Sequence, residues 1–314
     1  SSILPFKSAI KQVRKWMKPE KRKSMFPLGL LGGRSRIEFQ PLGVVGVLSP
    51  WNFPVNLTFG PMADILAAGN RVMIKPSEFT PTVSNLMAEI VADAWDEKEV
   101  AIFTGGPEVG AAFSTLPFDH MLFTGATSVA KHIMAAAAKN LVPVTLELGG
   151  KSPVLISRSA NIKTAVSRIM MGKTMNAGQI CLAPDYLMVP EEKLDEVIAE
   201  IKAAVASMYP TLLNNPEYTS LINDRHFQRL QENLTDATQK GAKVLCLAPA
   251  DEDFTAQQGT RKIAPTVITN VTDDMRVLQE EIFGPLLPIK TYKHFDETIR
   301  YVNAQPRPLA LYYF

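Results

Sequence analysis

The chain has 314 residues, of which 46% are hydrophobic and 20% charged, and its formal net charge is +2. This is the composition of a globular protein of about two domains, and so small a charge favours neither nucleic acid nor an anionic membrane as a partner. Two cysteines far apart in the sequence provide no disulfide framework and indicate a reducing compartment such as the cytoplasm. The four histidines form no metal-binding motif, so we expect no metal site.

The ends of the chain suggest an internal portion of a longer protein. The chain begins without methionine in a helical pattern and stops on residues 309–314, an apolar strand-like run with no closing turn. Such a strand needs neighbours for its apolar and backbone groups. The sequence contains no signal-peptide pattern and no apolar run long enough to span a bilayer.

The first forty residues have a basic, partly helical pattern. Apolar residues recur at helical spacing over residues 6–17. The basic stretch 7–23 admits a phosphate-binding patch, but we favour a solvated amphipathic helix that runs into a polar connector. Residues 27–33 are typical of a turn region, and the polar–apolar alternation of residues 35–40 predicts an exposed hairpin strand.

Between residues 41 and 150, short apolar strands alternate with helices. We expect strands at 44–48, 71–75, 100–103, 120–124 and 144–148. A helix is expected at 61–68, and another begins at Thr80-Pro81, with threonine as its cap and proline in its first turn. Repeated strand–helix units with short links predict an α/β fold with a parallel sheet, whose ligands lie beyond the carboxyl ends of the strands.

A second α/β series follows the glycine pair Gly149-Gly150, which we interpret as the hinge between two units. Its expected helices are 162–175 and 191–207. Its expected strands are 154–156, 186–189, 242–247, 264–271 and 286–292.

Side chains suited to binding follow the strands of the first unit. Asn52 lies in a loop stiffened by two prolines, Lys75 and Glu78 follow the second strand, and Gly125 opens a turn into a helix. A carboxylate after the second strand suits a ribose diol, and helix N–H groups after a glycine turn suit a pyrophosphate. Taken singly, Gly125 can be a simple strand-to-helix turn, and Lys75 with Glu78 can be a surface pair. A standard G-x-G-x-x-G fingerprint is absent.

Cys181 is a candidate nucleophile because it lies among small residues after the predicted helix 162–175. A cysteine reacts as its thiolate, and Ala177 and Gly178 leave room for a substrate carbonyl beside the sulfur. The alternative is a small buried hydrophobe, which is the usual role of a cysteine outside a disulfide.

Together, motifs along most of the chain resemble those of the aldehyde dehydrogenase superfamily. They occur in the family's order and are Pro50-Trp-Asn-Phe-Pro54, Lys75-Pro-Ser-Glu78, Phe123-Thr-Gly125, Leu146-Glu-Leu-Gly-Gly-Lys151, Gly178-Gln-Ile-Cys181 and Glu281-Ile-Phe-Gly-Pro285. Stretches 26–41, 179–186 and 307–314 resemble the class 3 branch and, within it, bacterial coniferyl aldehyde dehydrogenases.

The resemblance implies the fold and domains of that superfamily. Residues 1–40 would form an N-terminal helix and a bridging hairpin, which is part of an oligomerisation element. Residues 41–148 would form a Rossmann-like NAD(P)-binding domain and residues 149–308 a catalytic domain, with 309–314 starting a return to the coenzyme domain. Class 3 relatives suggest a homodimer.

The resemblance also implies roles in catalysis. Cys181 would attack an aldehyde carbonyl to give a thiohemiacetal, and the Asn52 amide and the Cys181 backbone N–H would hold the oxyanion. Oxidation would leave a thioester on Cys181, and Glu147 would act as general base for the water that hydrolyses it. The alternatives are a structural Asn52 and a Glu147 that merely pairs with Lys151.

For the coenzyme, the resemblance places Lys75 and Glu78 at the adenosine ribose, Gly125 at the pyrophosphate, Glu281 at the nicotinamide ribose and Phe283 near the nicotinamide ring. Glu78 would repel a 2′-phosphate, so NAD is expected to be preferred, although class 3 relatives often also accept NADP. Further predicted contacts are Pro50, Trp51, Ser77, Ala126, Ser128 and Gly149. Many relatives have serine and glycine where this chain has Ala126 and Ala130, a difference that bears on coenzyme affinity.

The expected substrate is an aromatic aldehyde resembling coniferyl aldehyde. The alternatives are a medium- or long-chain aliphatic aldehyde and a catalytically incompetent portion of such an enzyme. Glu147 argues against release of the thioester to coenzyme A, since that reaction needs no base for water. A cysteine hydrolase needs a histidine base, and neither His120 nor His132 lies in a matching motif.

Overall fold

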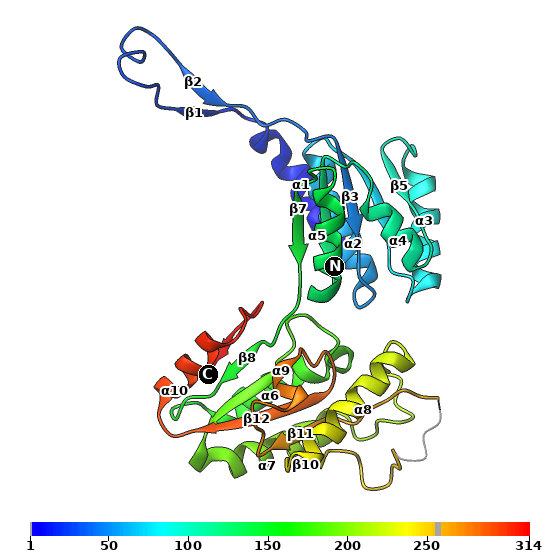
Figure 1. The fold of residues 1–314 in the computed structure, drawn as a ribbon, viewed down its shortest axis with the longest axis vertical. Coiled ribbons are helices and arrows are strands. Elements are labelled where there is room, and N and C mark those ends of the chain that lie inside the picture. The colour runs from blue at the N-terminus through cyan, green and yellow to red at the C-terminus, as the bar shows by residue number, and fades with distance from the viewer. Residues whose placement is uncertain (1, 255–258) are drawn as a thin grey trace. The chain divides into compact units, whose positions relative to one another are not determined.

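The computed structural model describes residues 2–254 and 259–314. The chain folds as two compact units, unit 1 (Ser1–Leu148) and unit 2 (Gly149–Phe314), coloured blue to green and green to red in Figure 1. The boundary falls at the glycine pair that the sequence marks as a hinge.

A five-stranded parallel sheet forms the centre of unit 1, in the order β5-β4-β3-β6-β7. Its strands are β3 (Val44–Leu48), β4 (Arg71–Lys75), β5 (Val100–Ile102), β6 (His120–Thr124) and β7 (Val144–Glu147). Every one of these strands begins at the residue that the sequence predicts. The predicted α/β fold with a parallel sheet is therefore confirmed.

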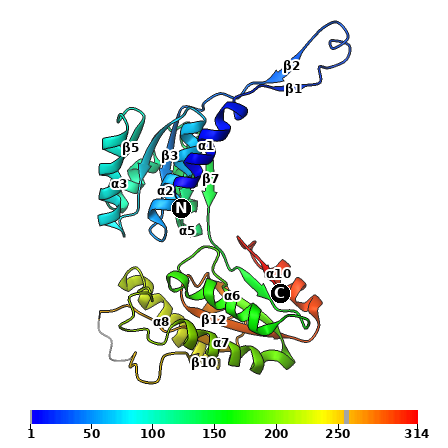
Figure 2. The same cartoon turned by 180° about the vertical axis from the view of Figure 1, so that it is seen from behind.

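Helices cover both faces of this sheet (Figures 1 and 2). They are α1 (Ile3–Trp16), α2 (Pro54–Ala67) and α3 (Pro81–Ala94) on one face, and α4 (Pro107–Ser114) and α5 (Thr127–Ala138) on the other. Side chains alternate along β3, so Val45 and Val47 pack toward α2 and α3, while Leu48 packs in the cluster of α4 and α5. A strand buried on both faces is apolar throughout, which is why the sequence identifies it so well.

One local expectation for unit 1 is wrong, and another is confirmed only in the start of the helix. Helix α2 begins at Pro54 and carries Pro61 inside it, whereas the sequence suggested a start at Pro61. Proline is favoured in the first turn of a helix, so both Pro54 and Pro61 are plausible starting points in the sequence. Thr80 occupies the N-cap position of α3, but its hydroxyl makes no capping hydrogen bond and has no partner among the described residues.

The segment between α1 and β3 contains a separate antiparallel hairpin of β1 (Glu20–Arg22) and β2 (Ser35–Ile37), labelled in Figure 1. β2 is the exposed strand that the alternation predicts, although it is shorter than expected. β1 was expected to be a polar connector, because three exposed residues leave no apolar pattern. The basic residues of α1 are exposed, as the favoured interpretation of this helix requires.

Unit 2 contains a six-stranded sheet in the order β10-β11-β12-β9-β8-β13, parallel except for the pairing of β10 with β11. Its strands are β8 (Pro153–Leu155), β9 (Tyr186–Pro190), β10 (Lys243–Cys246), β11 (Thr266–Thr269), β12 (Leu286–Tyr292) and β13 (Tyr312–Tyr313). β13 pairs with β8, so these residues pack on unit 2. The resemblance instead implied that residues 309–314 start a return to the coenzyme domain.

Two helical layers enclose the sheet of unit 2. One layer contains α6 (Ile162–Thr174) and α7 (Leu194–Met208), which is preceded by the short 3-10 helix η2 (Glu191–Lys193). The other contains α8 (Asp224–Gln239), α9 (Arg276–Gln279) and α10 (Phe295–Ala304). The sequence analysis did not predict α8 to α10. A 3-10 segment, η1 (Met175–Gly178), follows α6 directly.

Candidate active site

In unit 1, the predicted site residues follow the carboxyl ends of neighbouring strands. The ends are in register, because Leu48 pairs with both Lys75 and Phe123, and Thr124 pairs with Glu147. The direction of strand order reverses between β3 and β6. A parallel sheet of this kind binds its ligand at the crevice beside such a reversal.

The loop after β3 carries Pro50, Trp51 and Asn52, all three half-buried. Ser49 fixes the start of this loop, since its N–H donates to the Lys75 carbonyl at 3.2 Å and its hydroxyl accepts from Thr58 at 2.6 Å. Thr58 is a buried residue of α2. The loop is therefore held at its start by both the neighbouring strand and the following helix.

The loop after β4 contains a buried cation with a partly exposed carboxylate. Lys75 Nζ donates to Glu78 Oε2 at 2.9 Å, and the two side chains are 3% and 31% exposed. Ser77 is buried, and its hydroxyl accepts from the Phe79 N–H at 3.2 Å while its carbonyl accepts from the Ser84 hydroxyl at 2.9 Å. Burial of Lys75 rules out the alternative of a surface pair.

The turn after β6 prepares the N-terminus of α5. The Gly125 N–H donates to the Glu147 carbonyl at 3.0 Å, and a Cβ on Gly125 would lie 2.6 Å from the Phe123 ring. Ala126 is the N-cap of α5 and provides no side-chain acceptor, so the first N–H groups of the helix stay available to an anion. Ser128 in the first turn is exposed, and Glu147 is the exposed last residue of β7.

In unit 2, Cys181 lies in a tight turn between α6 and β9. The Ala183 N–H donates to the Ile180 carbonyl at 2.9 Å, which places Cys181 and Leu182 at the two central positions. Cys181 is half-buried, unlike a core cysteine, and neither it nor Cys246 is in a disulfide. The nucleophile candidate is therefore partly accessible and held in a defined local geometry.

The approach to this turn is strained. Asn176, Ala177 and Gly178 have φ of 51°, 52° and 74°. Residues other than glycine rarely adopt this left-handed backbone conformation. A Cβ on Gly178 would overlap the Gly284 carbonyl, so two backbones meet here without room for a side chain. Phe283, beside Gly284, also has a positive φ of 46°. Such strain persists only where the surroundings hold it, and it is typical of functional sites.

Gln179 is the side chain that holds the strained segment. It is 2% exposed, its Nε2 donates to the carbonyls of Asn176 at 3.0 Å and Ser220 at 3.2 Å, and its Oε1 accepts from the Ile222 N–H at 2.9 Å. One buried amide thus joins the segment before Cys181 to the loop before α8.

Glu281 and Gly149, two predicted coenzyme contacts, are direct neighbours. A Cβ on Gly149 would overlap the Glu281 carboxylate, and the Gly150 N–H donates to that carboxylate. Burial raises the pKa of Glu281 to about 7, and nearby Asp185 adds to the rise. The Gly150 hydrogen bond and the cations Lys151 and Arg229 oppose the shift. The carboxylate is therefore poised to change charge near neutral pH.

Lys151 and Asp185, whose side chains are 15% and 4% exposed, form an ion pair near Glu281. Lys151 also donates to the carbonyls of Val277 at 2.7 Å and Glu280 at 2.9 Å, and Asp185 Oδ2 accepts from the Ile282 N–H at 2.9 Å. All three ammonium hydrogens of Lys151 are thereby used, which rules out the alternative that it merely pairs with Glu147.

Two further cations belong to this cluster. Arg229 of α8 donates to the carbonyls of Glu281 at 3.2 Å and Ile282 at 2.6 Å. Lys173 of α6 is 1% exposed, and burial lowers its pKa to about 8, while Asp185 acts in the opposite direction. The backbone around Glu281 is consequently fixed from several segments.

Sequence reasoning assigned no role to Lys151, Gln179, Asp185, Lys173 or Arg229. The first three lie inside the quoted motifs, so their presence there was a usable signal. Arg229 lies in a helix that the analysis did not predict. The segments 149–151, 176–183 and 281–284 all precede strands of the unit 2 sheet. The general rule for parallel sheets places ligands at the carboxyl ends of the strands instead.

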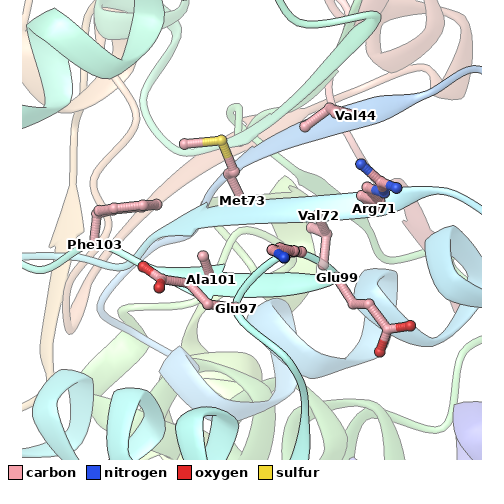
Figure 3. A pocket seen from close by; sticks show the side chains of 9 residues that line it. Val44, Arg71, Val72, Met73, Glu97, Glu99, Ala101 and Phe103 are labelled. Carbon is pink, nitrogen blue, oxygen red and sulfur yellow. The ribbon is translucent and has the colours of Figure 1, made fainter.

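A separate pocket of about 260 Å³ lies over β4 and β5 of unit 1 (Figure 3). Its lining residues include Arg71, Glu97 and Glu99 near the amino ends of these strands, with Met73 and Phe103 as apolar surface. None of the predicted site residues lines this pocket, so it is not part of the candidate site.

Within residues 2–254 and 259–314, no cluster of three or more histidine, cysteine or acidic side chains could hold a metal ion. Over the same residues, no helix has the length and apolar character needed to cross a membrane.

Comparison with protein families gives a match to the family described as "Aldehyde dehydrogenase family" over residues 4–313. Coniferyl aldehyde dehydrogenase of Pseudomonas sp. strain HR199 is 60% identical over 313 residues, which cover 100% of this chain and 64% of the relative. Aldehyde dehydrogenase family 3 member A2 of the mouse is 42% identical over 279 residues, 88% of this chain and 55% of the relative. The higher identity of the Pseudomonas protein agrees with the resemblance drawn from the motifs.

Solved structures show the same fold. The substrate-bound state of Staphylococcus aureus AldH superimposes with a TM-score of 0.90 at 38% identity, over 100% of this chain and 66% of that chain. An aldehyde dehydrogenase of Mycobacterium tuberculosis complexed with NAD+ gives 0.84 at 29% identity, over 96% and 62%. The chain thus spans about two thirds of the length of the proteins it matches.

Proposed function

Because the chain belongs to the aldehyde dehydrogenase family, we propose that the protein oxidises an aldehyde to its carboxylic acid with NAD or NADP. The observation that carries this proposal is the nucleophile turn: a half-buried Cys181 held in a strained, hydrogen-bonded segment inside the family's motif. The reaction needs a reduced thiol, so a reducing compartment such as the cytoplasm is part of the proposal.

In the proposed first step, the Cys181 thiolate adds to the aldehyde carbonyl and forms a thiohemiacetal. The Asn52 amide and the Cys181 backbone N–H would stabilise the developing oxyanion, and loss of one such donor typically costs about 3–4 kcal/mol. When bound, NAD would supply the acceptor for the hydride that leaves the thiohemiacetal carbon. Glu147 would then take a proton from the water that attacks the thioester, which releases the acid.

The residues present fit a dinucleotide. Lys75 and Glu78 offer a charged pair for a ribose, and the N-terminus of α5 after Gly125 offers backbone donors for a pyrophosphate. In unit 2, the space beside Gly149 is filled by the carboxylate of Glu281, which suits a second ribose. The NAD+ complex of the Mycobacterium tuberculosis relative supports the use of a nicotinamide coenzyme. Phe283 beside this carboxylate is the apolar surface proposed for the nicotinamide ring.

We infer an aromatic aldehyde of the coniferyl type as substrate, because the Pseudomonas relative carries that name. The test is a panel of coniferyl aldehyde, benzaldehyde and hexanal with NAD or NADP, followed by the absorbance of the reduced coenzyme, with Cys181→Ala as the control. We expect the highest kcat/KM for coniferyl aldehyde. A preference for hexanal would replace the aromatic proposal by the aliphatic one. Absence of reduced coenzyme with every aldehyde, for this chain and for a polypeptide extended to the relatives' length, would refute the activity.

A homodimer is the expected assembly, and the hairpin supports it. The connection between β1 and β2 exposes several large apolar side chains, with Phe26, Leu30 and Leu31 each 79% exposed. Patches of this kind mark interaction surfaces. Light scattering should give the mass of two chains, and replacing Leu30 and Leu31 by aspartate should give the mass of one.

A further inference from the structure

Tyr312 is a residue of unit 2 that no step of the proposed reaction uses, although it contacts the nucleophile turn. Its hydroxyl donates to the Leu182 carbonyl at 2.7 Å, across 130 positions of sequence. Leu182 directly follows Cys181 in the turn closed by the bond from Ala183 to Ile180. The phenol therefore binds the Leu182–Ala183 peptide group, whose N–H closes the turn around the candidate nucleophile.

The strand that carries Tyr312 is itself firmly fixed. Tyr312 pairs with Val154 of β8, the Phe314 N–H donates to the Leu155 carbonyl at 3.0 Å, and the Ser157 N–H donates to the Phe314 carbonyl at 2.8 Å. The hydroxyl consequently provides a rigid anchor for the turn. Burial raises the pKa of Tyr312, and the charge of Cys181 adds to the rise, so the phenol keeps its proton at neutral pH.

The nucleophile turn is thus held from both sides. Gln179 fixes the residues before Cys181, and Tyr312 fixes the carbonyl after it. The Leu182–Ala183 peptide group closes the turn through its hydrogen bond to the Ile180 carbonyl, and rotation of this group would open the turn and move the Cys181 side chain. A displacement of about 1 Å at a reacting group can lower a rate by about 100-fold.

We propose that Tyr312 is a positioning residue that keeps the Cys181 turn in its reactive conformation through the hydrogen bond to Leu182. This role rests on the proposed function of Cys181 as nucleophile. It concerns the hydroxyl and not the ring. The neighbouring Tyr313 provides the matched control, because its side chain points to the opposite face of the strand, is 61% exposed and makes an edge contact with Phe295.

The reactivity of Cys181 tests the proposal without any aldehyde. Iodoacetamide is added at a series of pH values, and mass spectrometry follows the modification of Cys181, with the exposed Cys246 as the internal reference. Tyr312→Phe is expected to slow modification of Cys181 by about 3- to 10-fold, the range that loss of one hydrogen bond allows. Cys246 in every variant, and Cys181 in Tyr313→Phe, should react at the wild-type rate.

A pair of isosteres separates the hydrogen bond from packing. Tyr312→4-aminophenylalanine keeps a donor at the position of the hydroxyl and should restore the rate, whereas Tyr312→4-fluorophenylalanine fills the same space without a donor and should behave like Tyr312→Phe. In the aldehyde assay, the same two non-donor variants should lose kcat/KM for aldehyde by a similar factor while KM for NAD is unchanged.

Wild-type reactivity of Cys181 in both non-donor variants would overturn the proposal, as would a slow 4-aminophenylalanine variant. If Tyr312→Phe fails to fold, the two isosteres decide by themselves. Absence of aldehyde oxidation in the wild-type protein would refute the proposed function instead. The rates of Cys181 modification by iodoacetamide would still test the role of Tyr312.

Discussion

The candidate residues of the two units lie at opposite edges of their sheets. In unit 1 they lie at or after the carboxyl ends of β3, β4, β6 and β7, and in unit 2 they precede β8, β9 and β12. At a carboxyl edge the following helices begin, so backbone N–H groups are presented. At the amino edge of unit 2, the backbone presents carbonyls that need donors.

The hydrogen bonds follow this difference. In unit 1 the N-termini of α2, α3 and α5 have no side-chain cap, which leaves donors for a ligand. In unit 2 the exposed carbonyls are taken by donors from distant segments, namely Lys151, Gln179, Arg229 and Tyr312. A coenzyme has to enter and leave, whereas a nucleophile has to remain in place, so the two edges are built for different tasks.

The largest expected effect tests the rigidity of the unit 2 edge. Asp185→Ala removes the only carboxylate that pairs with the largely buried Lys151 among the described residues, and it removes the acceptor of the Ile282 N–H. Breaking a buried pair in this way costs about 3–5 kcal/mol, so the free energy of unfolding in urea should fall by that amount. Aldehyde oxidation should fall with it, because the backbone of Glu281 loses its anchor.

The matched change in unit 1 is Glu78→Ala. Glu78 is 31% exposed, so its removal admits water toward the Lys75 ammonium, and a loss of about 1–3 kcal/mol, smaller than that for Asp185, is expected. An exposed pair in unit 2, Arg276 with Glu232, gives the baseline, and Glu232→Ala should change stability by less than about 1 kcal/mol. Equal losses of unfolding free energy in Asp185→Ala and Glu78→Ala would show that the two edges do not differ in rigidity.

The second prediction concerns the strained segment before Cys181. Gly178→Ala forces a side chain into a left-handed position and against the Gly284 carbonyl. Backbone strain of about 1–2 kcal/mol and overpacking of about 1–3 kcal/mol should lower the free energy of unfolding by about 2–5 kcal/mol. Activity should be lost even at temperatures where the variant stays folded, because Cys181 is three residues away.

Gly241→Ala is the control for this change. Gly241 has φ of +87°, yet a Cβ there would meet nothing within 4 Å, so only the backbone strain of about 1–2 kcal/mol applies. The difference between the two variants in urea unfolding measures the close contact with Gly284. If Gly178→Ala proved no more destabilising than Gly241→Ala, the backbone contact would contribute nothing to the fixed edge.

The sequence predicts unit 1 far better than the surroundings of Cys181, for a physical reason. A strand buried on both faces is a continuous apolar run, so β3, β4 and β6 were predicted with the bounds that the structure has. Helices α8 and α10 each have only a few fully buried residues, and their polar sequences gave no comparable signal. A continuous apolar strand is therefore easier to identify from the sequence than an amphipathic helix with few buried residues.

The candidate site shows the same limit. Motifs identified Cys181, Glu281 and Gly149 as residues of interest, and the last two prove to be in contact. The hydrogen bonds from Arg229 and Tyr312 join residues far apart in the chain, and no spacing rule connects them. Left-handed conformations at Asn176 and Ala177 were equally hidden, because neither residue type requires them.

The third prediction uses the pH dependence of stability to examine Glu281. Its pKa is raised from 4.5 to about 7, so the folded state binds more protons than the unfolded state between these values. Stability is therefore highest below pH 4.5 as far as this group is concerned, and it is lost as pH rises through about 7. The shift corresponds to a loss on the order of 3 kcal/mol.

Glu281→Gln should remove this slope in urea unfolding measured across the same pH range, and the neighbouring exposed Glu280→Gln should retain it. Affinity for NAD should also rise through pH 7 in the unmodified protein, because the ionised carboxylate is the better acceptor for ribose hydroxyls. An unchanged slope in Glu281→Gln would mean that a group other than Glu281 produces the pH dependence.

The smallest expected effect tests whether the unit 1 edge distinguishes its ligand by charge. Lys75 and Glu78 are paired, so their charges largely cancel, and a 2′-phosphate is opposed only weakly. Glu78→Gln removes the negative charge and leaves the Lys75 ammonium to attract the phosphate, so kcat/KM for NADP relative to NAD should rise about tenfold, or about 1.4 kcal/mol. Glu97→Gln makes the same charge change near the amino ends of β4 and β5, and it should leave the ratio of kcat/KM for NADP to that for NAD unchanged. A constant ratio in Glu78→Gln would mean that backbone donors alone select the coenzyme. The tenfold change would instead show that one ion pair sets coenzyme choice at an edge whose shape the substitution leaves intact.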